Sequence, residues 1–133
     1  MKNQNGQSML LEGDYYTLLG SDADGLSGSF DLAIRPESRI FEGHFPGNPV
    51  CPGVCGVELI RECAARVVGC NLRIARISKC RFLSVARPQD GCRLSIDVAL
   101  TPADDGAYQL RAKMHDGSKD YMSFAGTVQT EKP

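Results

Sequence analysis

Only one segment of this chain has the apolar spacing of an α-helix. This small number of helical segments limits the possible folds more than any other feature. The segment, Val54–Val68, contains no proline and is followed by Gly69, which suits the left-handed residue that ends many helices. Its predicted apolar stripe consists of Val57, Ile60, Ala64, Val67 and Val68. A protein of 133 residues with one such helix must build the rest of its core from strands.

Alternating apolar and polar residues predict strands on both sides of this helix. Residues 15–34 indicate a first hairpin with a turn at 21–25, and the chain from Leu72 onward fits four strands. Turn-forming residues separate those four strands at 88–91, 104–106 and 116–117. A doubly wound nucleotide-binding fold is disfavoured, because its parallel strands need a helix at every crossover. The pattern predicts a single α+β domain over residues 1–133, in which residues 1–8 form a flexible polar terminus.

Composition disfavours several functional classes. Fifteen Lys and Arg against 16 Asp and Glu leave a net charge of -1, whereas nucleic-acid binding needs an excess of basic residues on one face. The sequence has no apolar run of about 18 residues and no signal peptide, which predicts a cytoplasmic protein without a membrane span. The six cysteines include no Cys-x-x-Cys pair, and we interpret them as buried free thiols.

His44 lies in a proline-rich loop, residues 36–52, that leads directly into the helix. Proline limits the backbone freedom of such a loop, so we expect the imidazole near the helix N-terminus. There the N–H groups of Gly53 and Val54 have no helical partner and lie at the positive end of the helix dipole, which suits an oxygen that gains negative charge. The other histidine, His115, is interpreted as a solvent-facing residue at a strand end.

Two carboxylates, Glu58 and Glu62, lie four residues apart and therefore on one face of the helix. Glu62 precedes Arg66 by four residues, the favourable order for an exposed ion pair, and we prefer this structural interpretation for it. Glu58 borders the apolar stripe, so we expect partial burial and the neighbouring Glu62 to raise its pKa. On spacing alone, a structural and a catalytic role for Glu58 remain equally open.

Two motifs resemble those of a known enzyme family. The first is His-Phe-Pro-Gly-Asn-Pro-Val-Cys-Pro-Gly-Val, residues 44–54, with Glu58 fourteen positions after His44. The second is Cys-Arg-Phe-Leu-Ser-Val-Ala-Arg-Pro-Gln-Asp, residues 80–90, in which Gln89 replaces a glycine of the family. Together they are similar to the signature of the 3-hydroxyacyl-acyl-carrier-protein dehydratases of the hotdog fold. The resemblance implies an antiparallel β-sheet wrapped around one long central α-helix, and two protomers that share each active site.

The resemblance also implies a reaction and a role for each motif residue. The enzyme would dehydrate a (3R)-hydroxyacyl thioester on acyl carrier protein to the trans-2-enoyl thioester, in fatty-acid or related acyl-chain synthesis. His44 would remove the α-proton, Glu58 would protonate the departing hydroxyl, and the Gly53 N–H would polarise the thioester carbonyl. Three further residues would bind the substrate: Phe45, Pro52 and Val54. Such a hydro-lyase requires no metal and no redox cofactor.

A basic segment between Asn71 and Gln89 suggests what kind of protein the chain binds. No Asp or Glu lies between Asn71 and Gln89. The segment contains five basic residues, Arg73, Arg76, Lys79, Arg81 and Arg87. Acyl carrier proteins are acidic, so complementary charge would favour docking of a phosphopantetheine-linked substrate. Ordinary solvated strand charges explain the segment equally well. The expected assembly is a homodimer or a higher homo-oligomer.

Three other interpretations stay open. A hotdog thioesterase would use a helix carboxylate to activate water, and a non-catalytic hotdog subunit would only bind the acyl chain. Thiol chemistry at Cys51 or Cys55, which flank the helix start, is the third, although no second histidine lies near either cysteine in the sequence.

Overall fold

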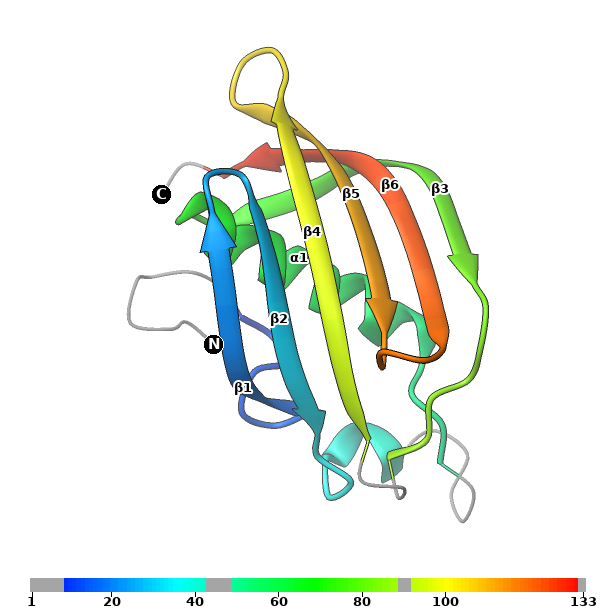
Figure 1. Cartoon of the computed structure of the whole chain (residues 1–133). Helices are drawn as coiled ribbons and strands as arrows, with labels where there is room; N and C mark the ends of the chain where they lie inside the picture. The colour runs from blue at the N-terminus through cyan, green and yellow to red at the C-terminus, as the bar shows by residue number, and fades with distance from the viewer. Residues whose placement is uncertain (1–8, 43–48, 89–91, 132–133) are drawn as a thin grey trace.

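The computed structural model describes residues 9–42, 49–88 and 92–131. This part of the chain forms one antiparallel sheet and one long α-helix, α1, which spans Gly53–Val68 (Figure 1). A short 3-10 helix, η1, spans Arg39–Glu42. The strands are β1 Tyr16–Asp24, β2 Ser27–Ile34, β3 Leu72–Phe82, β4 Arg93–Pro102, β5 Ala107–His115 and β6 Asp120–Thr130.

The six strands lie in the order β1-β2-β4-β5-β6-β3, and all neighbouring strands are antiparallel. The sheet curls around α1, and β1 and β3 form its two edges (Figure 1). α1 carries the chain from β2, near one edge of the sheet, to β3 at the other edge. After β3 the chain returns to β4, which pairs with β2. This arrangement confirms the predicted antiparallel sheet wrapped around one helix, and the four strands predicted after the helix.

The first hairpin differs from the prediction at its turn. β1 continues through residues 21–24, which pair with residues 27–30 of β2. The turn lies at Gly25 and Leu26, where Gly25 has a φ of 63°, a conformation that glycine adopts without steric cost. Of the residues expected to turn, Gly25 does so, whereas residues 21–24 are exposed strand residues. Their polar composition reflects an edge strand in contact with solvent rather than a chain reversal.

The buried face of α1 is wider than the predicted stripe. Ile60 and Ala64 are fully buried as expected, but the three valines of the stripe are only half-buried. The other buried helix residues are Cys55, Gly56, Leu59, Arg61, Glu62, Cys63 and Ala65. Because the sheet surrounds the helix, a broad arc of its circumference is covered, and that arc includes two charged side chains.

The end of the helix is as predicted. Gly69 adopts a φ of 84°, and its N–H donates a 2.8 Å hydrogen bond to the carbonyl of Ala65. The chain then enters β3, an edge strand, only three residues later.

All six cysteines are free, which confirms the predicted thiols, although only Cys55 and Cys63 are buried and the other four are half-buried. Within residues 9–42, 49–88 and 92–131, no helix has the length and apolar character needed to cross a membrane.

Candidate active site

The start of α1 combines unpaired N–H groups with close packing. Pro52 precedes the helix in an extended conformation, with φ -64° and ψ 144°, and makes no side-chain capping bond. Gly53 and Val54 lie too early in the helix for their N–H groups to have an acceptor within it. A side chain at position 53 would place its Cβ 2.8 Å from the Phe82 ring. Glycine therefore fits this position, and the helix dipole leaves it electropositive.

An apolar pocket lies beside this helix start. Pro52 and Gly53 line it from the helix, and Met114 of β5 and Met122 of β6 line it from the sheet. Gly56 also lines it, and a Cβ there would lie 2.9 Å from the sulfur of Met122. The pocket therefore joins apolar walls to the positive end of a helix dipole.

The predicted substrate residues divide into three groups. Pro52 and Gly53 line this pocket, whereas the side chain of Val54 is 73% exposed. The predicted base His44 and its neighbour Phe45 lie outside the described residues. Of the predicted substrate-binding residues, the structure thus describes the three at the helix start, Pro52, Gly53 and Val54.

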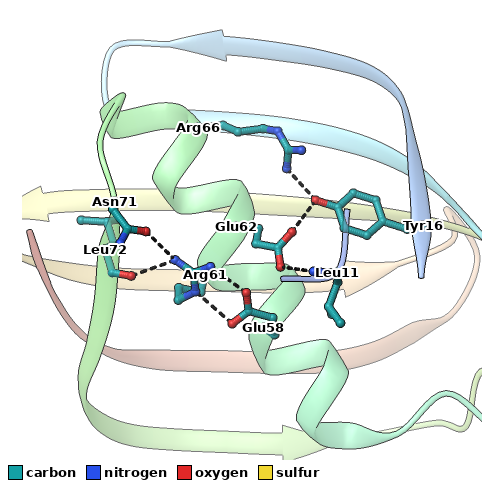
Figure 2. Close-up of polar contacts among 8 residues, drawn as sticks. All are labelled: Leu11, Tyr16, Glu58, Arg61, Glu62, Arg66, Asn71 and Leu72. Carbon is teal, nitrogen blue, oxygen red and sulfur yellow. Dashed lines mark hydrogen bonds and ion pairs between the residues drawn. The ribbon is translucent and has the colours of Figure 1, made fainter. Parts of the chain in front are cut away.

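Glu58 forms a two-pronged ion pair with Arg61, one helical turn further on (Figure 2). The Arg61 Nη2 atom lies 2.6 Å from Oε2 of Glu58, and Nε lies 2.9 Å from Oε1. Burial raises the pKa of Glu58, but the bonds from Arg61 and a hydrogen bond with Glu62 outweigh it, so the pKa is lowered overall. The expected rise in the pKa of Glu58 is therefore wrong, because the sequence interpretation did not include Arg61.

Arg61 connects Glu58 to the beginning of β3. Its Nη1 atom donates to the carbonyl of Leu72 at 2.9 Å and to Oδ1 of Asn71 at 3.2 Å (Figure 2). The Arg61 residue is only 8% exposed. The sequence interpretation missed this residue, although Glu58 and Arg61 have the three-residue spacing that brings side chains together on a helix.

Glu62 is completely buried, contrary to the predicted exposed ion pair with Arg66. Its Oε2 accepts the N–H of Leu11 at 3.0 Å, and its Oε1 accepts the hydroxyl of Tyr16 at 2.8 Å (Figure 2). Burial and the carboxylate of Glu58 raise the pKa of Glu62 to about 8, against the lowering effect of these two hydrogen bonds. The carboxylic acid that keeps its proton near neutral pH is therefore Glu62 and not Glu58.

Arg66 bonds elsewhere than predicted. Its Nη1 donates to the Tyr16 hydroxyl at 2.8 Å, and its Nη2 lies 2.8 Å from the carboxylate of Glu12. Tyr16 is fully buried, and burial, together with Glu62, raises the pKa of its hydroxyl. The segment before β1 is thus attached to the helix through Glu12 and Leu11, which the sequence pattern did not indicate.

Glu58 and the apolar pocket face different directions within one chain. Gly53 and Glu58 are five residues apart in the helix. This separation corresponds to a rotation of roughly 140° beyond one full turn, so Glu58 lies on another side of α1 from Gly53. Glu58 lines a separate groove with residues that include Arg73 and Ile74 of β3 and Glu131. The structure therefore does not bring Glu58 and Gly53 into one pocket of a single chain.

The predicted docking residues are all exposed. Arg73, Arg76, Lys79 and Arg81 lie on the edge strand β3, and Arg87 lies after it. No acidic residue is interspersed among the four that lie on the strand. The edge of the sheet thus presents positive charge to solvent.

His115 ends β5 as predicted, but its side chain is 24% exposed, and its Nε2 lies 2.8 Å from Oδ2 of Asp97. It is a paired strand residue rather than a free solvent-facing one. In the described part of the chain, no three His, Cys, Asp or Glu side chains form a group that could hold a metal ion.

Most of the chain is similar in sequence to known dehydratases. Residues 21–124 match the ApeI-like family model, described as ApeI dehydratase. The FabZ 3-hydroxyacyl-[acyl-carrier-protein] dehydratase of Chloroflexus aggregans is 35% identical over 69% of each chain. The FabZ protein of Lactiplantibacillus plantarum is 29% identical over 80% of each chain. The matched region spans 61% of the length of the FabZ protein of Lactobacillus helveticus and 64% of that of Caulobacter vibrioides.

Solved structures share the fold at low sequence identity. A chain of the dehydratase heterocomplex ApeI:P from Xenorhabdus doucetiae superposes with a TM-score of 0.69 at 16% identity, covering 86% of this chain and 97% of that chain. The uncharacterized protein PH1136 from Pyrococcus horikoshii gives a TM-score of 0.72 at 9% identity, covering 100% of this chain and 96% of that chain. Fold and family match agree: the chain belongs to the ApeI-like dehydratase family and has the hotdog fold.

Proposed function

We propose that the protein dehydrates a (3R)-hydroxyacyl thioester, held on the phosphopantetheine of an acyl carrier protein, to the trans-2-enoyl thioester. The observation that carries the proposal is the helix start, where Gly53, whose N–H has no acceptor within the helix, lines an apolar pocket. Loss of the α-proton places negative charge on the thioester oxygen, and an N–H group at the positive end of a helix dipole stabilises that charge.

The two proton transfers need a base and an acid. His44 is proposed as the base, because an imidazole has a pKa near neutrality and can accept the α-proton. Glu58 is proposed as the group that delivers a proton to the departing β-hydroxyl, which leaves as water. Family membership and the spacing of fourteen residues between His44 and Glu58 support this pairing.

Two protomers would complete each site. Gly53 and Glu58 face different sides of α1, so a site that uses both can take the helix start from one chain and the carboxylate from another. We propose a homodimer assembled beside the β3 edge, since the groove at Glu58 is lined by Arg73 and Ile74 of that strand. Apolar side chains exposed near this edge support the interface: Val54, Ile77, Phe82, Leu83 and Val85. The Xenorhabdus doucetiae structure is a heterocomplex, so a different hotdog chain is the alternative partner.

The basic residues of β3 and Arg87 are proposed to dock the acyl carrier protein. An acidic carrier approaching a positively charged edge is attracted over a distance of about 10 Å at moderate salt. Such docking speeds association and makes the Michaelis constant for the carrier-bound substrate dependent on ionic strength.

The direct test follows formation of the enoyl thioester by its absorbance. We expect the native protein to dehydrate a 3-hydroxyacyl thioester, and we expect His44→Ala and Glu58→Gln to lose at least about 100-fold in kcat. Both substitutions remove the carboxylate that pairs with Arg61, but Glu58→Gln keeps the shape of the side chain and one acceptor oxygen for Arg61, which alanine would not. His115→Ala and Glu37→Gln are matched controls that should retain activity. A native protein that binds the thioester without converting it would instead be an acyl-binding subunit.

One observation favours a second candidate function. Arg61 holds Glu58 in its ionised form, and an ionised carboxylate is the state that activates water in a thioesterase. The two functions differ in their products, since a thioesterase releases a free acid and a thiol. Chromatographic separation of acid from enoyl thioester distinguishes them without a thiol reagent, which the six free cysteines would consume.

A further inference from the structure

The structure presents a conflict in the proposed acid. A group that protonates the departing hydroxyl must hold a proton at the working pH. Glu58 is instead paired through both oxygens with Arg61, at 2.6 and 2.9 Å, which favours its carboxylate form. The proton for the reaction therefore has to be held by another group that contacts Glu58.

Glu62 lies one helical turn after Glu58 on the same face of α1, which places the two carboxyl groups next to each other, and each affects the pKa of the other. It is completely buried, and its two oxygens accept bonds from the neutral donors Leu11 N–H and Tyr16 O–H (Figure 2). The ion pairs of the two nearby arginines go to Glu58 and to Glu12. A second carboxylate charge at Glu62 would thus be buried beside Glu58 without a cation of its own, and this favours the protonated acid.

We propose that Glu62 is a positioning residue that holds the proton of a Glu58–Glu62 carboxyl pair, so that the pair, and not Glu58 alone, serves as the acid. The inference rests on the proposed function and deepens it. The O–H bond of Glu62 breaks as Glu58 takes its proton, and Glu58 passes a proton to the hydroxyl oxygen as the C–O bond of the substrate breaks, so that the hydroxyl leaves as water. The α-proton has gone to His44. Before the next turnover, His44 releases that proton to solvent and the carboxyl pair regains one from solvent.

The groups that face Glu62 come from three parts of the chain. The segment before β1 provides the Leu11 N–H and, through Arg66, the carboxylate of Glu12. β1 provides the hydroxyl of Tyr16. The helix itself provides the titratable and charged groups of Cys55, Glu58, Arg61, Cys63 and Arg66. Of these groups, Glu58 is the one positioned to pass a proton toward the groove.

The first arm of the test needs no turnover. Carbon-13 labelling of glutamate carboxyl groups reports the titration of each by NMR. We expect one carboxyl to titrate near pH 8 in the native protein, to be absent in Glu62→Gln, and to move to lower pH in Glu58→Gln, where the neighbouring charge is gone. A native protein in which every glutamate titrates below about pH 6 overturns the inference, whatever its activity.

The second arm measures kcat against pH. Glu62→Gln keeps the shape of the side chain and one of its two acceptor oxygens but has no proton to transfer. The alkaline limb of kcat against pH should therefore move down by at least about one pH unit, with kcat at pH 7.5 lowered at least about tenfold and KM changed less than about twofold. Tyr16→Phe removes a hydrogen bond that favours the ionised form of Glu62. The alkaline limb of kcat against pH should therefore move to higher pH in this variant. Glu37→Gln, an exposed carboxylate, is the matched control for both variants.

The possible outcomes distinguish a failure of this inference from a failure of the proposed function. A dehydratase whose Glu62→Gln variant keeps the native kcat and alkaline limb overturns the inference and leaves the proposed function standing. A chain that catalyses no dehydration overturns the proposed function, and the acid role of the pair falls with it.

Discussion

At its start, α1 meets the sheet through glycines and methionines, and the pocket there contains no carboxylate and no basic side chain among its lining residues. Two turns later, the same helix buries Arg61 and Glu62 among directed hydrogen bonds. The properties of the pocket at the helix start depend on the shape of its side chains, whereas those of the polar region depend on which of its side chains are protonated. Changes of volume should therefore act mainly on the first region, and changes of charge mainly on the second.

The largest effect should follow from removing the cation of the polar region. Arg61→Leu leaves Glu58 half-buried without its partner and deprives the carbonyl of Leu72 of its donor. We expect a loss of about 3–5 kcal/mol in the free energy of unfolding, measured by chemical denaturation. Arg39→Leu, which removes a guanidinium that is 86% exposed, is the control and should change stability by less than about 0.5 kcal/mol. A loss below about 1 kcal/mol for Arg61→Leu would show that the pair contributes little.

The next effect is a dependence of stability on pH. The pKa of Glu62 is raised from 4.5 in the unfolded chain to about 8, so between these values the folded protein holds a proton that the unfolded chain has lost. The free energy of unfolding therefore falls as pH rises through this window, by up to about 5 kcal/mol in total. Glu62→Gln has no such proton and should show a flatter profile. Equal slopes in the native protein and the variant between pH 5 and about 8 would contradict this assignment.

A change of volume sharpens the comparison from the other side. Gly56→Val adds atoms where a Cβ alone would lie 2.9 Å from the sulfur of Met122 and 3.2 Å from Met114. We expect a loss of about 1–3 kcal/mol in stability and a reduced affinity for long acyl thioesters, with no shift in the pH dependence of stability. Thermal unfolding and ligand titration at two pH values test both parts. A pH shift in this variant would mean that the two regions are not separate.

The smallest effect on stability should come from the basic edge. Arg81→Glu reverses an exposed charge on β3 and should change the free energy of unfolding by less than about 0.5 kcal/mol. We expect a severalfold higher KM for a substrate on acyl carrier protein and an unchanged KM for the same acyl group on a small thiol. If both constants change alike, the residue contributes to the site itself and not to docking.

The sequence predicts the fold well and the site in part. Period-two alternation, one uninterrupted helical run and Gly69 account for the sheet, α1 and its end. The turn of the first hairpin was misplaced because exposed edge strands and turns have the same polar composition. Pro52 and Gly53 were identified from the motif, whose glycine the Phe82 ring requires.

The polar network could not be predicted because its contacts connect residues far apart in the sequence. Helical spacing pairs Glu62 with Arg66, but the bonds of the two side chains go elsewhere. Leu11, before β1, donates to Glu62, and Tyr16, the first residue of β1, bonds to both Glu62 and Arg66. Burial by a distant segment reverses the expected order of the two carboxyl pKa values. Helical spacing indicates which side chains can meet, and tertiary burial decides which of them stay charged.

The guanidinium of Arg61 has one further consequence, for assembly. It bonds at once to Glu58 and to Leu72, the first residue of the edge strand β3. In the proposed dimer, a second chain that adds to this edge and moves the beginning of β3 would also move the carboxylate, which would link dimerisation to the orientation of Glu58. By reciprocity, a substrate that held Glu58 in the orientation of the dimer would tighten the association of the two chains by the same factor.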